Sequence, residues 1–316
     1  MHFKNDIAVL ILAYKRIDSL IKILESCKRN FVARIYIAID GFEENDLSNI
    51  QTKAELLNKI QAFIVNFDGL VFVKSRSRNV GCAVSILSAC DWIFEREPSA
   101  IILEDDCIPG DQFFEFVSKS LKLMEAKPNI WLVCGTQFAP ENYIEDGWLL
   151  SHYSLTWGWA TSKNKWLEIS NALKKSEFRY NLNFSLSENV YWKSGARRAK
   201  MGLTQGWDAL LIQQMISFDK LAILPNVSLI KNVGNDHFAT HVKGDSTVFN
   251  LSLKKHAPSL SKPRLQPRVD NWIRSHHFNI GIRHLISTRI TLMLDWALGL
   301  NSDKSNLTRR WAESEL

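Results

Sequence analysis

Short apolar runs alternate with amphipathic stretches along the first 135 residues. The runs are rich in Ile, Val and Leu without polar residues at every second position, a pattern typical of strands covered on both faces. They lie at residues 7–14, 34–40, 70–75, 100–105 and 130–135. Because helical segments separate them, the pattern predicts a parallel α/β sheet.

Three amphipathic segments between these runs predict helices. They cover residues 17–28, 81–96 and 111–124. In the first segment, apolar residues recur every three or four positions and therefore share one helix face. Asp111 stands where the third segment begins, and we expect it to be the N-cap of that helix.

The pattern becomes aromatic and irregular after residue 135. We expect a helix at 205–218 and a strand around 221–230 in this part. A last helical segment is expected at 280–300, where a broad apolar face is interspersed with Arg283 and Arg289.

The predicted elements divide the chain into three parts. Residues 1–242 form the main domain, in which 1–135 hold the predicted parallel strands and 136–242 are rich in aromatic residues. Residues 243–268 are polar and dotted with proline, and we expect them to be a linker. Residues 269–316 are predicted to be a basic, helical C-terminal extension.

The composition is that of a globular protein, with 46% apolar and 23% charged residues among 316. The five cysteines are scattered and never spaced as CxxC, which argues against a disulfide framework and a zinc site. The apolar run at 7–13, preceded by Asp6, is too short and wrongly charged for a signal peptide or a membrane span. We therefore expect a reducing, cytoplasmic location.

The net charge of +6 is concentrated in the last part of the chain. Residues 262–316 contain nine Lys and Arg against five Asp and Glu, a difference of +4. Such a region can face nucleic acid, anionic lipid or an acidic substrate, and charge alone does not choose among them. The apolar face at 280–300 can lie on an anionic membrane, at its inner face, or dock on the main domain. The eleven tryptophans are expected to serve in the core first, and beyond that as platforms for sugars or bases.

The strongest chemical signal is the string AIILEDDCIPGDQFF. A predicted buried strand ends there in Glu104, Asp105 and Asp106, at the edge where open α/β sheets bind ligands. Three adjacent carboxylates repel one another unless a cation neutralises them, and oxygen ligands suit Mg²⁺ or Mn²⁺. The alternative is a solvated acidic turn without a ligand.

Phosphate-binding loops of the GxxxxGK[ST] and GxGxxG types are missing after every predicted strand. A nucleotide would therefore be held by other residues. Arg16, after the first strand, can reach a phosphate, and Asp40, after the second, can accept a hydrogen bond from a base or ribose. Both can equally be ordinary residues at strand ends.

Several strings in order resemble nucleotide-sugar-dependent glycosyltransferases of the GT-A fold. They are LILAYKR, IAIDG, SRNVG, ILEDDCIPGDQFFEF, LTWGWATSKNKW, GWDALL and PNVSLIKNVGNDHFATH, within roughly residues 6–242. The chain is similar to the N-acetylglucosaminyltransferase I-like family and to bacterial enzymes of polysaccharide and lipopolysaccharide assembly. The resemblance implies a Rossmann-like, mostly parallel sheet in 1–135 that binds the nucleotide sugar, and an acceptor half in 136–242.

The resemblance also implies roles for the residues at the sheet edge. Asp106 matches the ligand of the Mn²⁺ or Mg²⁺ ion that bridges the donor diphosphate. Glu104 and Asp105 would contact ribose, donor sugar or metal-bound water, and Asp40 would contact the base. Arg78 and Asn79 of SRNVG sit at a helix start, where the family approaches the nucleotide.

Further matches lie in the second half of the main domain. Trp157 and Gly158 of LTWGWAT match a segment that borders the donor sugar and the acceptor. His241 matches a late metal or diphosphate ligand, while a surface histidine without a ligand remains the alternative. Asp208 of GWDALL matches the catalytic base.

The residues around Asp208 support that role independently. The apolar Trp207, Leu210 and Leu211 would partly desolvate the carboxylate and make it a better proton acceptor. An acidic residue in the first turn of a helix is also favoured by the helix dipole, without any catalytic purpose. The sequence alone leaves both interpretations open.

The predicted reaction moves a sugar from a nucleoside diphosphate, taken as UDP, to a hydroxyl of a glycan or lipid-linked saccharide, with inversion and a divalent cation. It would serve the assembly of a surface polysaccharide. One alternative is a sugar nucleotidyltransferase, but such enzymes usually carry a glycine-rich loop after the first strand and LAYKRIDSL has no glycine. The other is a non-catalytic protein that binds glycan or nucleic acid; a nucleic-acid partner is not expected.

Overall fold

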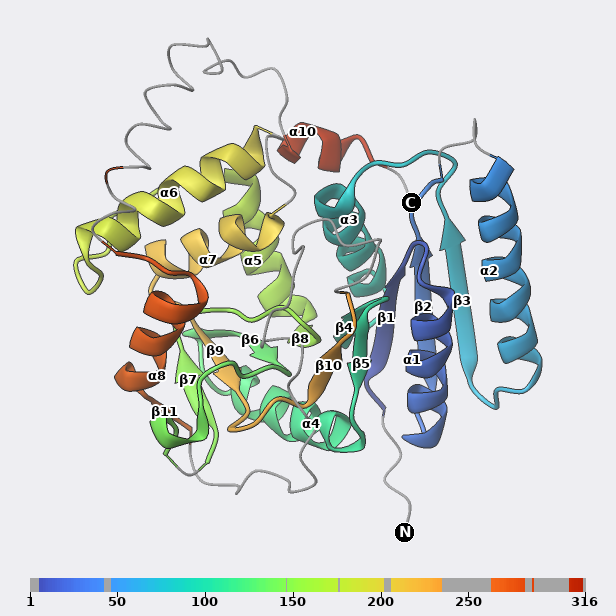
Figure 1. Ribbon diagram of the computed structural model, residues 1–316, viewed down its shortest axis with the longest axis horizontal. Helices are drawn as coiled ribbons and strands as arrows, with labels where there is room; N and C mark the ends of the chain where they lie inside the picture. Colours follow the sequence, from blue (N-terminus) through green and yellow to red (C-terminus); the bar gives the residue numbers. More distant parts are fainter. Residues whose placement is uncertain are drawn as a thin grey trace.

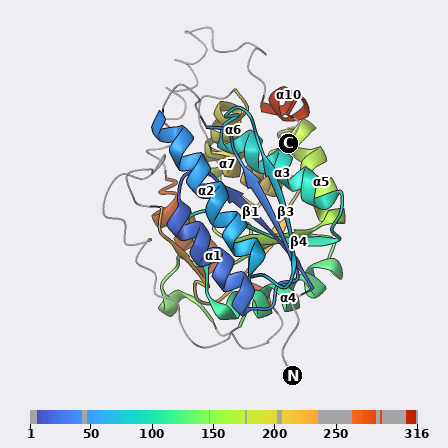
Figure 2. The same ribbon diagram turned by 90° about the vertical axis from the view of Figure 1, so that its right-hand side faces the viewer.

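The structure is a computed structural model that describes residues 6–42, 47–145, 147–175, 177–201, 206–234, 263–281, 286 and 307–314. Its strands form one large sheet and a small ribbon, and helices cover both faces of the sheet (Figures 1 and 2). The strands are β1 Ala8–Ala13, β2 Arg34–Ile39, β3 Leu70–Ser75, β4 Ser99–Glu104, β5 Cys107–Pro109, β6 Ile130–Cys134, β7 Leu149–Ser151, β8 Trp159–Ser162, β9 Leu221–Leu224, β10 Ile230–Asn232 and β11 Arg264–Leu265. The helices are α1 Ile17–Arg29, α2 Leu47–Val65, α3 Cys82–Phe94, α4 Asp111–Glu125, α5 Lys163–Lys175, α6 Leu186–Lys200, α7 Trp207–Ser217, α8 Pro267–Trp272 and α10 Leu307–Ala312, with short turns η1 Glu141–Tyr143 and η3 Ile273–His277.

The described strands of the large sheet follow the order β11-β7-β9-β6-β8-β4-β1-β2-β3. The neighbours β3, β2, β1 and β4 all run parallel, which confirms the predicted arrangement for the first four apolar runs. The fifth run, β6, does not lie beside β4, because β8 is inserted between them and is antiparallel to both. The fold is α/β with a large, mostly parallel sheet, compatible with a Rossmann-like fold.

Alternate residues of β1 enter two separate apolar cores, one on each face of the sheet. Leu10 belongs to the core that includes residues of α3, α5 and α7, while Ile11 belongs to the core that includes residues of α1, α2 and α4, and both are fully buried. The prediction that both faces are covered is wrong for β3, where Leu70 is 58% and Phe72 37% exposed. The reason is its place as the edge strand of the described sheet, with fewer elements to cover it.

The predicted helices at 17–28, 81–96, 111–124 and 205–218 are present as α1, α3, α4 and α7, with ends shifted by at most two residues. The prediction that Asp111 is an N-cap is wrong. Gly110 holds the cap position without a side-chain hydrogen bond, and Asp111 is the first helical residue. Its negative charge still stabilises the helix through the dipole.

The strand expected around 221–230 is two strands. β9 lies in the large sheet, whereas β10 leaves it and pairs antiparallel with β5 in the small ribbon. Pro225 follows β9 and has no N–H to continue the ladder, which explains the break. This change of partner carries the chain back to the end of β4, where the acidic run lies.

Several elements of the second half were not predicted from the pattern. β7 and β8 have only three and four residues and do not stand out from an aromatic sequence. Helices α2, α5 and α6 were also missed. For α6 the sequence did carry a signal, because Ser185 and Glu188 form a complete capping box.

Most tryptophans serve the core, as predicted. Eight of the eleven are buried in the described part of the chain. The rings of Trp159, Trp166, Trp207 and Trp311 follow one another at centroid distances of 5.7 to 6.4 Å. Because Trp311 comes from α10, this aromatic cluster joins the C-terminal end of the chain to the centre of the main domain.

The described parts of the C-terminal extension dock on the main domain. The indole N–H of Trp311 donates to Asp91 of α3 at 2.8 Å, and Trp166 donates to the same carboxylate at 2.7 Å. The predicted helix at 280–300 lies outside the described residues except for 280, 281 and 286, as does the linker up to residue 262. Among the helices that are described, none has the length and apolar character needed to cross a membrane.

Candidate functional site

Three neighbouring parallel strands, β2, β1 and β4, end at the same edge of the sheet. Arg16 follows β1, Asp40 follows β2, and the acids Glu104, Asp105 and Asp106 lie at the end of β4 and directly after it. Ligands of open α/β sheets bind outside this edge. The structure therefore brings five of the predicted site residues to one place.

Asp105 points back into the protein and anchors the turn after β1. Its Oδ2 accepts a hydrogen bond from the Tyr14 N–H at 2.8 Å, and its Oδ1 accepts one from Arg16 Nη1 at 3.1 Å. Burial, followed by the charge of Asp106, raises the pKa of Asp105 to about 6, although Arg16 opposes the rise. Both oxygens are thus engaged within the protein, and Asp105 holds Arg16 in position.

Asp106 is the outermost of the three acids, with a side chain 17% exposed. Its Oδ2 lies 3.5 Å from Arg16 Nη1, and its Oδ1 lies 3.4 Å from the side-chain amide of Asn232. The Val233 N–H donates to the Asp106 carbonyl at 2.9 Å, next to the ribbon of β5 and β10. A partly exposed carboxylate on a backbone held in this way can bind a hard cation through oxygen.

Asn232 and Gly234 belong to this site, although sequence analysis assigned them no role. The Gly234 N–H donates to Asn232 Oδ1 at 2.7 Å. A Cβ atom at Gly234 would overlap Oδ2 of Asp106, so only glycine leaves room for the carboxylate here. The string KNVGNDH carried the signal, because Gly and Asn together favour a tight turn.

Glu104 connects the acidic run to Asp208. Burial raises the pKa of Glu104 well above its ordinary value, and the negative charges of Asp106, Asp105 and Asp208 add to the rise, while Arg16 opposes it. Asp208 is the second residue of α7, about a hundred positions further along the chain. The fold therefore brings Asp208 within the range of charge interaction with the acidic run.

The start of α3 lies among four carboxylates. Cys82, its first residue, remains exposed. Loss of hydration, then the negative charges of Glu104, Asp208, Asp106 and Asp40, raise the pKa of its thiol well above the ordinary value. Because these acids come from β2, β4 and α7, the site carries an excess of negative charge that a bound cation would relieve.

Asp40 ties the end of β2 to the loop before α3. Its Oδ1 accepts hydrogen bonds from the N–H groups of Gly41 at 2.8 Å and Val80 at 3.2 Å. Burial raises the pKa of Asp40, while these bonds oppose the rise. Gly41 lies against the backbone of Arg78 and Asn79 with no room for a Cβ atom. Asp40 therefore positions Arg78 and Asn79, whose side chains are exposed to an incoming ligand.

Trp157 and Gly158 lie beside the ribbon that holds Asp106. Gly158 has a left-handed φ of +64°, and a Cβ atom there would lie 2.5 Å from Ile230 of β10. Trp159 is buried, whereas Trp157 is partly exposed with its ring 4.9 Å from Phe138. Trp159 therefore packs in the core, and Trp157 is the one of the two that can reach a ligand.

His277 packs against Phe138, the same residue that contacts Trp157, with the two ring centroids 4.3 Å apart. Burial lowers its pKa from 6.5 to about 4. In the unfolded chain this histidine binds a proton as the pH falls below 6.5, whereas in the folded chain it binds one only near pH 4. The free energy of unfolding therefore decreases as the pH falls from 6.5 to about 4. His277→Gln should remove up to about 3 kcal/mol of that loss, measured as the difference in urea unfolding free energy between pH 7 and pH 4.5.

His276→Gln is the matched control, because this neighbouring histidine is exposed. It should keep the pH dependence of the unsubstituted protein. If His277→Gln and the unsubstituted protein lose the same free energy between pH 7 and pH 4.5, His277 does not account for the acid sensitivity.

The predicted ligand His241 lies outside the described residues, as does His237. Within the ranges that are described, no three His, Cys, Asp or Glu side chains come together as a metal-binding group. Mg²⁺ is often held by one or two carboxylates together with oxygen atoms of substrate phosphates, so Asp106 can contribute to such a site.

Comparisons with known proteins leave the family of the chain open. No family model matches it, and no curated protein does. Among solved structures it is similar to HddC from Yersinia pseudotuberculosis, with a TM-score of 0.30 and 16% identity over 50% of this chain and 77% of that one. HddC complexed with GMP-PN gives a TM-score of 0.30 and 15% identity over the same shares. Similarity this low carries no information about function, which has to be inferred from the chain's own residues.

Proposed function

We propose that the protein is a GT-A glycosyltransferase that moves a sugar from a nucleoside diphosphate to an acceptor hydroxyl. One observation carries the proposal: the negative charge of Asp208 of α7 raises the pKa of Glu104, and the charges of Asp208, Glu104 and Asp106 together raise the pKa of the Cys82 thiol. Sugar transfer needs positive charge at the leaving diphosphate and a base at the attacking hydroxyl. A site that can hold a cation on one side and offers a separate carboxylate on the other supports both requirements, and the GT-A-like motifs add to this.

Asp106 would hold the divalent cation, Mn²⁺ or Mg²⁺, with the predicted His241 as a second ligand. When bound, such an ion supplies charge stabilisation worth several kcal/mol in the transition state. The chain's own contribution is to orient the ligand. Arg16 holds the carboxylates of Asp105 and Asp106 at 3.1 and 3.5 Å, and Gly234 keeps the space around Asp106 free.

Asp208 would take the proton from the acceptor hydroxyl as that oxygen attacks the anomeric carbon. A single displacement of this kind inverts the anomeric centre and needs no covalent nucleophile. Trp157 would border the donor sugar and the acceptor, while Arg78, Asn79 and Asp40 serve the nucleotide. The donor is taken as UDP-linked and the acceptor as a glycan or lipid-linked saccharide of a surface polysaccharide.

Two other functions fit the site less well. A sugar nucleotidyltransferase would be expected to carry a glycine-rich turn after β1, and residues 14–17 at that position contain no glycine. A non-catalytic glycan-binding protein would be expected to present tryptophans to solvent, yet most of those described are buried. Neither alternative accounts for Asp208 beside the acidic run.

Asp106→Asn tests the proposal through ligand binding. In thermal melts with UDP, GDP, CDP or dTDP and Mn²⁺, one nucleotide should stabilise the unsubstituted protein by about 2.7 kcal/mol at a hundred times its dissociation constant. The shift should vanish with a chelator, and it should vanish in Asp106→Asn because the amide oxygen is a weaker ligand without charge.

Asp68→Asn is the control, since it removes the same charge from an exposed turn before β3, at the opposite edge of the sheet. It should keep the full nucleotide shift. The proposal fails if no nucleotide stabilises the folded protein, or if the shift persists with chelator and in Asp106→Asn.

A further inference from the structure

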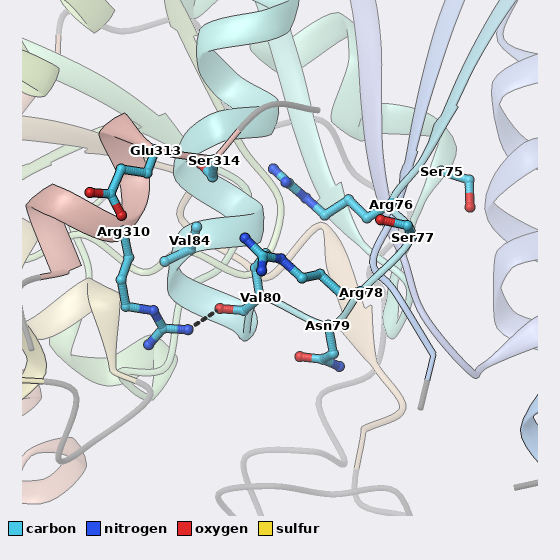
Figure 3. A pocket seen from close by; sticks show the side chains of 10 residues that line it. All are labelled: Ser75, Arg76, Ser77, Arg78, Asn79, Val80, Val84, Arg310, Glu313 and Ser314. Atoms are coloured by element: carbon cyan, nitrogen blue, oxygen red, sulfur yellow. Dashed lines mark hydrogen bonds between the residues drawn. The ribbon is translucent and has the colours of Figure 1, made fainter. Parts of the chain in front are cut away.

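A cavity of about 630 Å³ opens beside the acidic site, between the end of β3, the start of α3 and the C-terminal helix α10. Figure 3 shows Arg76 and Arg78 on one side of it and Arg310 on the other. None of the four carboxylates around Cys82 lines the cavity. The cavity shares Arg78 and Asn79 with the proposed nucleotide site, and α10 supplies one of its walls.

The cavity is positively charged. Three arginines face it, and Glu313 is the only acid among its described lining residues. Glu313 is already paired, because Arg309 Nε lies 2.7 Å from its Oε1. The balance is thus three cations against one carboxylate that has its own partner, so an anion in the cavity would be attracted.

Each arginine is held in place by a different part of the fold. Arg76 is buried and donates from Nη2 to the hydroxyl of Ser88 on α3. Arg310 reaches from α10 to the carbonyl of Val80, to which its Nη2 donates at 2.5 Å. Arg78 sits on the loop that Gly41 and Asp40 support. Positions fixed in advance reduce the entropy lost on binding a ligand.

The cost of burying Arg76 also points to an anion. Burial lowers the pKa of its guanidinium, and Asp40 only partly offsets the loss of hydration. An anionic ligand within reach would replace the missing solvation. Guanidinium groups bind phosphate oxygens in a planar, paired geometry, which makes phosphate the anion that three arginines suit best.

We propose that this cavity binds a phosphate or diphosphate group of an organic molecule, and that α10 completes it through Arg310. The volume exceeds that of a bare phosphate, and Val80 and Val84 give the cavity an apolar wall for the rest of the ligand. The inference rests on the proposed function for Arg78 and Asn79, which serve the nucleotide there, and adds Arg310 of α10 to them. Neither a divalent cation nor Asp106 takes part in this site. Two sources fit the chemistry: the donor nucleotide itself, or a phosphate on the acceptor or another ligand.

Arg310→Gln tests the site with inorganic pyrophosphate, titrated calorimetrically at low salt in the presence of chelator. The unsubstituted protein should bind pyrophosphate, and Arg310→Gln should weaken the binding about tenfold or more. Raising the salt concentration should weaken it further. Arg78→Gln should also weaken pyrophosphate binding. Because the Arg78 side chain is exposed, its substitution is not expected to disturb folding, and it serves as a second test if Arg310→Gln does not fold.

Arg96→Gln is the matched control, because it removes the same charge at the far end of α3, about 20 Å away along the helix. It should leave the affinity unchanged, as should Asp106→Asn, which separates this site from the proposed metal site. Equal affinities in Arg310→Gln, Arg78→Gln and the unsubstituted protein would overturn the inference, and so would the absence of binding at millimolar ligand.

A competition experiment then identifies the source of the phosphate. Pyrophosphate is titrated into protein saturated with Mn²⁺ and the nucleotide that stabilises it. Displacement that is weaker in Arg310→Gln than in the unsubstituted protein means that the cavity holds the donor's own phosphates, because chelation of Mn²⁺ by pyrophosphate would affect both proteins alike. Simultaneous binding means that the cavity holds a phosphate of a second ligand. Either result supports the site, and neither depends on Asp208 being a catalytic base.

Discussion

Asp208→Asn is expected to lower sugar transfer by about a hundredfold to ten-thousandfold, the usual contribution of a positioned general base. The substitution removes the proton acceptor but preserves the size and shape of the side chain. Asp208 sits in the first turn of α7, and its charge acts on Glu104 and on Cys82 at the start of α3. Donor binding, measured by the thermal shift with nucleotide and Mn²⁺, should remain within about twofold, because the base acts on the acceptor.

Asp111→Asn separates catalysis from helix stabilisation. Asp111 also lies in the first turn of a helix, α4, where its side chain is 73% exposed. If Asp208 mattered only through the helix dipole, both variants would lose a few tenths of a kcal/mol in stability and neither would lose turnover. A large loss of turnover in Asp208→Asn alone supports the base. Full turnover in Asp208→Asn would exclude it.

Gly234→Ala should weaken metal-dependent nucleotide binding by roughly fivefold to a hundredfold, corresponding to an overpacking cost of about 1–3 kcal/mol. The added methyl group would overlap Oδ2 of Asp106 and crowd Oδ1 of Asn232. The short Asp106 side chain can yield only by turning away from its present position. We therefore expect the fold to persist while the cation site is displaced, which calorimetric titration of the nucleotide with Mn²⁺ would measure.

Gly281→Ala provides the corresponding control, because no atom of the described residues lies within 4 Å of a Cβ atom at that position. It should bind nucleotide as the unsubstituted protein does. Pyrophosphate binding in the absence of metal should survive in both variants, since Gly234 does not line the arginine cavity. Normal nucleotide affinity in Gly234→Ala would mean that Asp106 does not need its present geometry.

The local sequence pattern predicted most of the strands in the first 135 residues for a physical reason. Strands such as 7–14 and 100–105 are covered on both faces, and continuous apolar runs of this kind are visible without knowledge of their partners. The prediction failed for strands whose position in the sheet is not reflected in their amino-acid composition. β3 is as apolar as its neighbours but lies at the edge, and β8 enters the sheet although its four residues carry no distinct pattern.

Some residues of the candidate site could likewise be predicted to meet, and others could not. Residues at the ends of parallel strands, such as Arg16 and Asp106, could be predicted to meet because parallel strands share a carboxyl edge. Asn232 and Gly234 could not, since β10 reaches Asp106 only by leaving the large sheet to pair with β5. The inward orientation of Asp105 depends on a hydrogen bond to Tyr14, about ninety positions away.

The sequence by itself determined the α/β class, the first four parallel strands and the acidic run at their edge, because periodicity and strand order are local properties of the chain. Only the tertiary structure decided which acid faces outward, that Asp208 joins the acids, and that Arg310 of α10 completes a cavity with Arg76 and Arg78. Arg310 and Val80 are 230 positions apart. Contacts over such separations result from the packing of whole elements around the two cores, which no local pattern encodes.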